Sequence, residues 1–127
     1  MSNERIQREA AEQEALFAWA ELMRGRLPGI ERMYHCPNGG SRNPVEAANL
    51  KRQGVKPGVP DIFLPVARGR YHGLYIEMKT DKGRLSDDQR DWLSALREQG
   101  YAAYVCRGWE RAAKLILKYY ELEAESK

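Results

Sequence analysis

The chain lacks the features that mark secreted, membrane-spanning or zinc-binding proteins. Its only two cysteines, Cys36 and Cys106, lie far apart and form no Cys-x-x-Cys pair, so no zinc framework is visible. No apolar run approaches the roughly 20 residues of a membrane span, and no signal-peptide pattern is recognisable. Two cysteines in this context are typical of free thiols in a reducing cytoplasm, so we expect a cytoplasmic protein with no membrane partner.

Repeats, low-complexity tracts and a strong net charge are also absent. The 127 residues favour one domain over residues 1–127, and 21 basic against 18 acidic residues leave a net charge of only +3. The charges are distributed unevenly along the chain. Residues 42–84 carry nine Lys or Arg and four Asp or Glu, whereas residues 1–21 carry two basic and five acidic residues. The basic excess in the middle of the chain suits a polyanionic ligand, although charge alone favours an ordinary solvated surface.

Two short apolar runs in that basic region predict a pair of neighbouring strands. Residues 58–65 and 73–79 have the length and the β-branched or aromatic content of strands, and residues 67–72 fit a hairpin-type connection. In an antiparallel pair Asp61 would lie near the late part of the second strand, where Glu77 and Lys79 project from one face. Two neighbouring carboxylates repel each other, and a metal ion is the usual way to hold them together.

The other segments predict a mixed α/β domain in which helices flank a small central sheet. The helices are expected from apolar stripes at helical spacing, and Pro28-Gly29 and Gly100 are expected to end two of them. Ser86 is a good N-cap for the third helix. The expected order is helix 3–26, strand 30–36, helix 44–53, the two central strands, helix 87–99, strand 101–106 and helix 109–121.

Polar residues on two of these helices could reach the end of the sheet. Extending the apolar stripe of the first helix backwards from Leu16 by four and by seven residues reaches Glu12 and Glu9. On the third predicted helix, Gln89 lies one turn before the apolar stripe and can reach the sheet end where Lys79 emerges. Each of these polar residues could equally face solvent, and the periodicity alone favours solvent for the two acids.

The glycine-rich loop over residues 37–42 offers a weaker signal. Its glycines could bring backbone amides near a phosphate, with help from Asn38 and Arg42. No Gly-Lys-Ser or Gly-Lys-Thr follows, so the loop is not of the Walker type, and such turns are more often only turns.

The three charged strand residues suggest one kind of chemistry. Asp61 and Glu77 can supply hard oxygen ligands to Mg²⁺ or Mn²⁺, with the backbone carbonyl of Met78 as a third donor. Lys79 could orient or deprotonate the attacking water and offset charge on the pentavalent phosphate. The interpretation is metal-assisted phosphodiester hydrolysis, although the bare spacing also fits a structural Glu–Lys pair.

The three charged residues belong to a longer pattern of linked motifs. Pro60-Asp61, a gap of 15 residues and Glu77-Met78-Lys79 resemble the PD-(D/E)xK nuclease signature. Together with Pro37-Asn38-Gly39-Gly40, residues 54–61 and Leu85-Ser86-x-x-Gln89-x-x-Trp92, they resemble the VRR-NUC family in the small stand-alone form found in phages and bacteria. The resemblance covers roughly residues 9–120, and it implies a restriction-endonuclease-like core and a Mg²⁺- or Mn²⁺-dependent DNA nuclease.

The resemblance also implies roles for individual residues. Asp61, Glu77 and the Met78 carbonyl match the metal ligands, Lys79 the catalytic lysine and Gln89 the active-site glutamine. A glutamate on the first helix completes the family's site, and we expect it to be Glu12 first and Glu9 second. Stand-alone members resemble Holliday-junction resolvases that act as homodimers, so a homodimeric endonuclease acting on branched DNA is implied.

Such an enzyme reads the shape of DNA, so its contacts should be mainly to phosphates. The residues expected to make these contacts are Asn38, Arg42, Lys51, Arg52, Lys56, Lys82 and Arg84. Two alternatives stay open from the sequence: a sequence-specific or nicking endonuclease of the same fold, and a DNA-binding module without catalysis.

Overall fold

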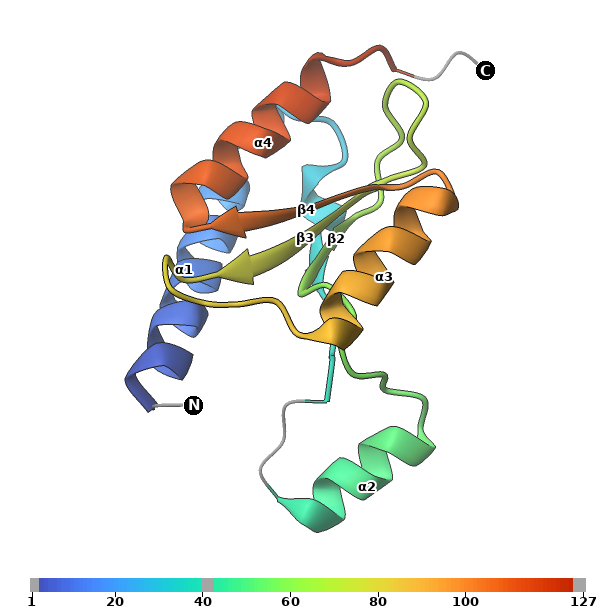
Figure 1. The fold of residues 1–127 in the computed structure, drawn as a ribbon. Coiled ribbons are helices and arrows are strands. Elements are labelled where there is room, and N and C mark those ends of the chain that lie inside the picture. Colours follow the sequence, from blue (N-terminus) through green and yellow to red (C-terminus); the bar gives the residue numbers. More distant parts are fainter. Residues whose placement is uncertain (1–2, 40–42, 125–127) are drawn as a thin grey trace.

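A four-stranded mixed sheet flanked by four helices forms the α/β fold of this protein (Figure 1). The computed structural model describes residues 3–39 and 43–124. Within those residues, none of the helices combines the length and apolarity that a membrane span requires. The elements are α1 (Asn3–Leu22), the 3-10 turn η1 (Ile30–Arg32), β1 (Tyr34–His35), α2 (Pro44–Arg52), β2 (Ile62–Leu64), β3 (Leu74–Lys79), α3 (Asp87–Glu98), β4 (Ala102–Arg107) and α4 (Trp109–Glu121).

The strands lie in the order β1-β2-β3-β4, so the sheet follows the chain order. β1 pairs antiparallel with β2, and β2 pairs antiparallel with β3, with Ile62 opposite Ile76. α3 provides the crossover that makes β4 parallel to β3. The expected antiparallel pairing of the two central strands is confirmed. Because β2 begins at Ile62, the preceding residue, Asp61, lies beside the late part of β3.

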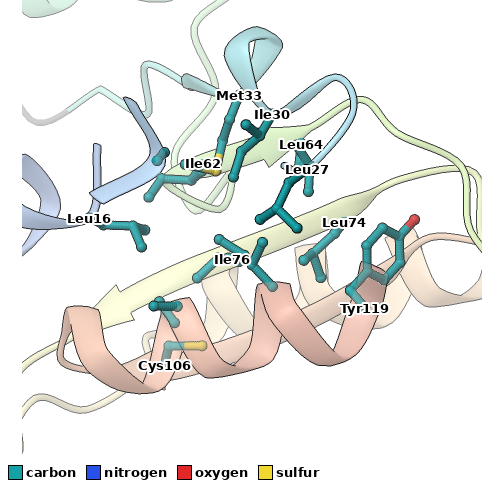
Figure 2. Packing of buried hydrophobic residues seen from close by; sticks show 14 of the residues in the cluster. Leu16, Leu27, Ile30, Met33, Ile62, Leu64, Leu74, Ile76, Cys106 and Tyr119 are labelled. Carbon is teal, nitrogen blue, oxygen red and sulfur yellow. The ribbon is translucent and has the colours of Figure 1, made fainter. Parts of the chain in front are cut away.

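One continuous apolar core joins α1 and α4 to the sheet. Leu16 of α1, Ile76 of β3 and Ile116 of α4 are fully buried in this cluster, which Figure 2 shows from close by. α3 lies on the other side of the sheet, where it packs over β4 (Figure 1). The two faces of the central strands are therefore covered differently.

The first helix and the first strand are shorter than predicted. α1 ends at Leu22 rather than at residue 26, and Gly25 follows with a φ of 86°, a left-handed conformation typical of residues just after a helix. Gly29 has a φ of 88° and opens η1, which buries Ile30 where a strand was expected to start. The strand expected over residues 30–36 is therefore wrong for its first part. The other helices end within one residue of their predicted limits.

Helix α2 stands apart from the sheet (Figure 1), and none of its residues is buried. A nine-residue helix without tertiary packing is marginal on propensity alone, so its caps matter. The Asn43 side chain accepts hydrogen bonds from the backbone N–H groups of Val45 and Glu46, and Pro44 occupies the first helical turn. We call α2 and the chain on either side of it, over residues 38–59, the α2 arm. At its base the Asn38 amide donates to the Val59 carbonyl at 3.4 Å, which links the segment that leads into α2 to the segment that returns from it.

Candidate active site

Strand β3 presents two sets of side chains that alternate along its length. Leu74, Ile76 and Met78 enter the core beneath α1 and α4, so the intervening Tyr75, Glu77 and Lys79 project from the opposite face. Glu77 is only 2 % exposed, and it is the buried charged residue of the described chain. A buried carboxylate needs compensating contacts, and its surroundings supply some of them.

The carboxylate of Asp61 is held by two donors from different parts of the chain. Asn38 Nδ2 donates to Oδ1 at 3.0 Å, and the backbone N–H of Met78 donates to Oδ2 at 2.8 Å. Asn38 was expected to contact DNA, and the structure places it on the carboxylate of Asp61. No local pattern indicates this contact, because it depends on the pairing of two distant residues: the backbone N–H of Cys36 donates to the carbonyl of Asp61, with 2.7 Å between N and O.

The carbonyl of Met78 lies where the β2–β3 ladder ends. In an extended residue of an antiparallel pair the N–H and C=O point to the same neighbour, and the Met78 N–H already points towards β2. Continuing the register from Ile62 opposite Ile76 brings Pro60 opposite Met78. Proline has no N–H, so it cannot donate a ladder hydrogen bond to the Met78 carbonyl.

Glu77 is surrounded by groups with opposing effects on its charge. Its Oε2 accepts a hydrogen bond from Gln89 Nε2 at 3.1 Å and lies 3.5 Å from Lys79 Nζ. Its Oε1 is buried and has no hydrogen-bond partner among the described residues. Burial, the larger cause, and the neighbouring charge of Asp61 raise the pKa of Glu77 from 4.5 to about 8. The positive charge of Lys79 acts in the opposite direction and lowers this pKa. The single positive charge of Lys79 therefore does not fully compensate the two neighbouring carboxylates.

The orientation of Gln89 follows from the N-terminus of α3. Ser86 Oγ accepts from the Gln89 backbone N–H at 3.1 Å, and Gln89 Oε1 accepts from the Ser86 backbone N–H at 2.9 Å, which is a capping box. The amide oxygen is thus occupied by the cap, which leaves Nε2 free to donate to Glu77. The predictions that Ser86 caps this helix and that Gln89 reaches the end of the sheet are confirmed.

Gly58 explains why the chain before Asp61 and the start of α3 lie together. Its φ is 88°, and a Cβ at this position would lie 2.6 Å from the backbone carbon of Asp88. Only glycine fits this conformation and this close approach. Gly58, three residues before Asp61, therefore lies against the first turn of α3, which carries the Ser86–Gln89 cap.

Arg107 holds the loop that follows β3, and no sequence argument pointed to it. Its guanidinium donates to the carbonyls of Thr80 at 2.8 Å and Gly83 at 2.6 Å, with a longer contact to Asp81. The parallel register opposite Lys79 puts Arg107 at this position. The side chain fixes the loop that carries Lys82 and Arg84.

Glu12 lies near the end of β3 but faces the start of α4. Its Oε2 accepts from the Trp109 backbone N–H at 3.3 Å, and it supplies an acceptor that the N-cap residue, Gly108, does not have. The Gly108 N–H in turn donates to the Lys79 carbonyl at 3.2 Å. Glu12 thus links α1 to the start of α4. The residue that it contacts, Trp109, directly follows Gly108, whose N–H is hydrogen-bonded to the backbone of Lys79.

A pocket of about 570 Å³ opens beside Glu12, between α1, the loop after β3 and the start of α4. Arg8, Lys82 and Trp109 help to line it, whereas Asp61 and Glu77 do not. Within residues 3–39 and 43–124, no group of three or more His, Cys, Asp or Glu side chains is placed to hold a metal ion. The active-site role expected of Glu12, or of Glu9 one turn earlier, stays a prediction.

The basic residues expected to bind DNA are exposed and lie on two segments. One segment is the α2 arm, with Lys51 and Arg52 in the last turn of the helix and Lys56 on the returning chain. The other is the loop after β3, with Lys82 and Arg84. Arg42 lies outside the described residues, and DNA binding by the others stays a prediction.

The comparisons with known proteins agree with this arrangement. The family model described as "VRR-NUC domain" matches residues 2–110. A solved structure titled "VRR_NUC domain protein" is 32% identical in sequence and superposes with a TM-score of 0.77, covering 91% of this chain and 90% of that chain. No curated protein matches. A match over most of the chain, on a fold that gathers the motif residues at one end of the sheet, shows that this protein belongs to the VRR-NUC family, a family of nucleases.

Proposed function

We propose that this protein is a Mg²⁺- or Mn²⁺-dependent endodeoxyribonuclease that selects branched DNA, such as a Holliday junction, and acts as a homodimer. The observation that carries the proposal is the buried carboxylate of Glu77, which lies beside Asp61 with Lys79 and Gln89 on the same oxygen. A buried carboxylate whose pKa is raised by burial and by a neighbouring charge is a candidate functional group.

The residues fit a divalent cation. Glu77 Oε1 is an orphaned buried acceptor, Asp61 retains lone pairs on both oxygens, and the Met78 carbonyl receives no ladder hydrogen bond from Pro60. Two carboxylates and one carbonyl are the hard oxygen donors that Mg²⁺ and Mn²⁺ prefer, and such a set leaves room for substrate oxygens. Asp61, Glu77 and Met78 would hold the ion.

When bound, the ion would supply Lewis acidity towards the phosphate and the attacking water. The protein's own residues would do the rest. Lys79, anchored on Glu77, would orient the water or accept its proton, and its charge would stabilise the negative charge that develops on the phosphoryl oxygens. Gln89 and Asn38 would keep the two carboxylates in place through the hydrogen bonds that they donate.

Substrate choice is the finer part of the proposal. The exposed basic residues of the α2 arm and of the loop after β3 would bind phosphates on either side of the cut. The homodimer is proposed from the family resemblance, since two copies would place two cuts symmetrically about a junction.

A panel of labelled DNAs tests the proposal directly. Linear duplex, flap and four-way junction substrates are incubated with the protein in Mg²⁺, Mn²⁺ or EDTA, and the products are sized. We expect metal-dependent, symmetric cutting that favours the junction, and a dimer by sedimentation. A single preferred sequence in linear duplex would instead identify a restriction or nicking endonuclease, and intact DNA in every arm would identify a binding module.

A further inference from the structure

Four aromatic rings form a continuous row across the sheet, and the proposed chemistry does not use them. The Tyr34 and Phe63 ring centroids are 5.9 Å apart, Phe63 stacks on Tyr75 at 4.3 Å with a 24° interplanar angle, and Tyr75 meets Tyr101 at 5.4 Å. We call Tyr34, Phe63, Tyr75 and Tyr101 the aromatic strip. It runs from the edge strand β1 across β2 and β3 to the residue just before β4.

The strip lies directly beside the two carboxylates, on the same face of the sheet. Phe63 is two residues after Asp61 on β2, Tyr75 is two residues before Glu77 on β3, and the two rings are opposite each other in the register. Two residues of a strand span about 6.6 Å. This step is close to the distance between successive phosphates of an extended nucleic-acid strand, so a nucleotide next to a phosphate held at the carboxylates would lie over the strip.

This part of the sheet is not covered by the helix on its side. α3 packs over β4, and α2 stands away from the strands (Figure 1). Tyr34 is 51% exposed, and Phe63, Tyr75 and Tyr101 are half-buried. The row is thus exposed at its Tyr34 end and partly accessible along the other three rings.

The stacking of the strip depends on a glycine. A Cβ on Gly73 would lie 2.7 Å from the ring of Phe63, so the absence of a side chain lets this ring lie flat across β3. The Phe63 ring can therefore keep its place in the strip only while residue 73 is a glycine.

We propose that unpaired bases of the DNA strand whose phosphate is cut stack on the aromatic strip. The inference rests on the proposed nuclease function and deepens it, because it specifies substrates with unpaired nucleotides next to the scissile phosphate. Every base has a π face, so such stacking is independent of sequence. Continuity with the carboxylates, together with the basic residues around them, favours nucleic acid over a second copy of this chain as the occupant.

Fluorescence of 2-aminopurine tests the stacking without requiring cleavage. The probe is placed in an unpaired stretch beside a duplex, with an all-duplex control, and the full-length protein is titrated in EDTA. Tyr34→Leu and Tyr75→Leu remove rings from the strip. Tyr104→Leu is the matched control, since Tyr104 is an exposed tyrosine on β4 outside the strip. Melting curves check that each variant folds.

We expect the native protein to quench the unpaired probe and the two strip variants to lose this quenching. Each strip variant should also bind the unpaired substrate roughly 5- to 100-fold less tightly while binding duplex as before. Unchanged quenching in both folded variants would overturn the inference. A second result would also overturn it: the strip variants lose affinity equally for all DNAs, and a dimer dissociates in sedimentation. The strip would then be a subunit interface.

The outcomes separate the two proposals. If the native protein cuts no DNA in Mg²⁺ or Mn²⁺ but the quenching depends on the strip, the nuclease proposal fails and the stacking stands. If the protein cuts branched DNA but the strip variants bind and quench like the native protein, the stacking fails and the nuclease proposal stands.

Discussion

The two faces of strand β3 carry the same number of side chains but opposite kinds of chemistry. On the face towards α1 and α4, Leu74, Ile76 and Met78 are buried in an apolar core whose contacts need no particular partner atom. On the other face, Glu77 and Lys79 are nearly as buried, yet their charged groups need specific partners, and of the two Glu77 oxygens only Oε2 has them among the described residues. The first face stabilises the fold, and the second retains an unsatisfied oxygen and a repelling pair of carboxylates.

The comparison indicates where stability and function separate in this protein. Apolar burial contributes to stability in proportion to area, whereas a buried carboxylate without full compensation costs stability unless a ligand restores the balance. Changes on the core face should therefore alter unfolding and leave the chemistry of folded molecules alone. Changes on the other face should alter the chemistry, and removal of a poorly compensated charge there should raise the stability of the metal-free protein.

The largest expected effect is that of Lys79→Ala. Loss of the amine beside Glu77 should lower the cleavage rate by about 10²- to 10⁴-fold, because the residue is proposed to act on the water and on the developing charge. Metal binding and DNA affinity should stay close to native values in titrations. The control is Lys82→Ala, which removes a nearby exposed lysine and should weaken binding only slightly. Native rates for Lys79→Ala would remove the proposed mechanism.

On the core face, Ile76→Ala should lower the free energy of unfolding by about 2–5 kcal/mol, since it leaves a cavity at a fully buried position. Chemical denaturation measures this. At temperatures well below the melting point, cleavage per folded molecule should stay within a few-fold of native. A variant as stable as the native protein would show that the core face of β3 does not carry the fold.

Glu77→Gln should make the metal-free protein more stable at pH 8 and leave it almost unchanged at pH 5. The pKa of Glu77 is about 8 in the folded protein and 4.5 ordinarily, so between these values the folded state binds a proton that the unfolded chain lacks. Stability from this group is therefore present below pH 4.5 and is lost as the pH rises towards 8. We expect a melting temperature roughly 10 °C or more above native at pH 8 in EDTA.

The same substitution provides its own test of metal binding. Mn²⁺ at pH 8 should raise the melting temperature of the native protein and have little effect on Glu77→Gln, because binding to the folded state stabilises it. Parallel pH–stability curves for the two proteins in EDTA would contradict the raised pKa of Glu77.

The smallest expected effect lies outside both faces, on the α2 arm. Lys51→Ala should weaken DNA binding only a few-fold and reduce the slope of log affinity against log salt by about 1, since each phosphate contact releases about one counterion. Binding titrations at several salt concentrations measure the slope. The cut position should not move, and a moved cut with an unchanged slope would show that Lys51 reads position rather than phosphate.

Much of the candidate site was predictable because it lies within short segments. The alternation in residues 74–79, the hairpin-type turn before them and the Ser86–Gln89 cap are local properties, and the antiparallel pairing brings Asp61 to Glu77 and Lys79. Element limits were less predictable where glycines break the pattern. Gly25 ends α1 four residues early, and Gly29 turns a predicted strand into a 3-10 turn.

The amino-acid sequence by itself determined the identities and spacing of the charged residues, the family and the α/β order of elements, since these follow from local periodicity and motif. Only the tertiary structure decided which partner each polar atom has. Asn38 meets Asp61 across 23 residues, Arg107 holds a loop about 25 residues before it, and Glu12 caps α4 across 97 residues. These contacts depend on strand register and helix packing, which bring together residues whose separation in the chain carries no periodic signal.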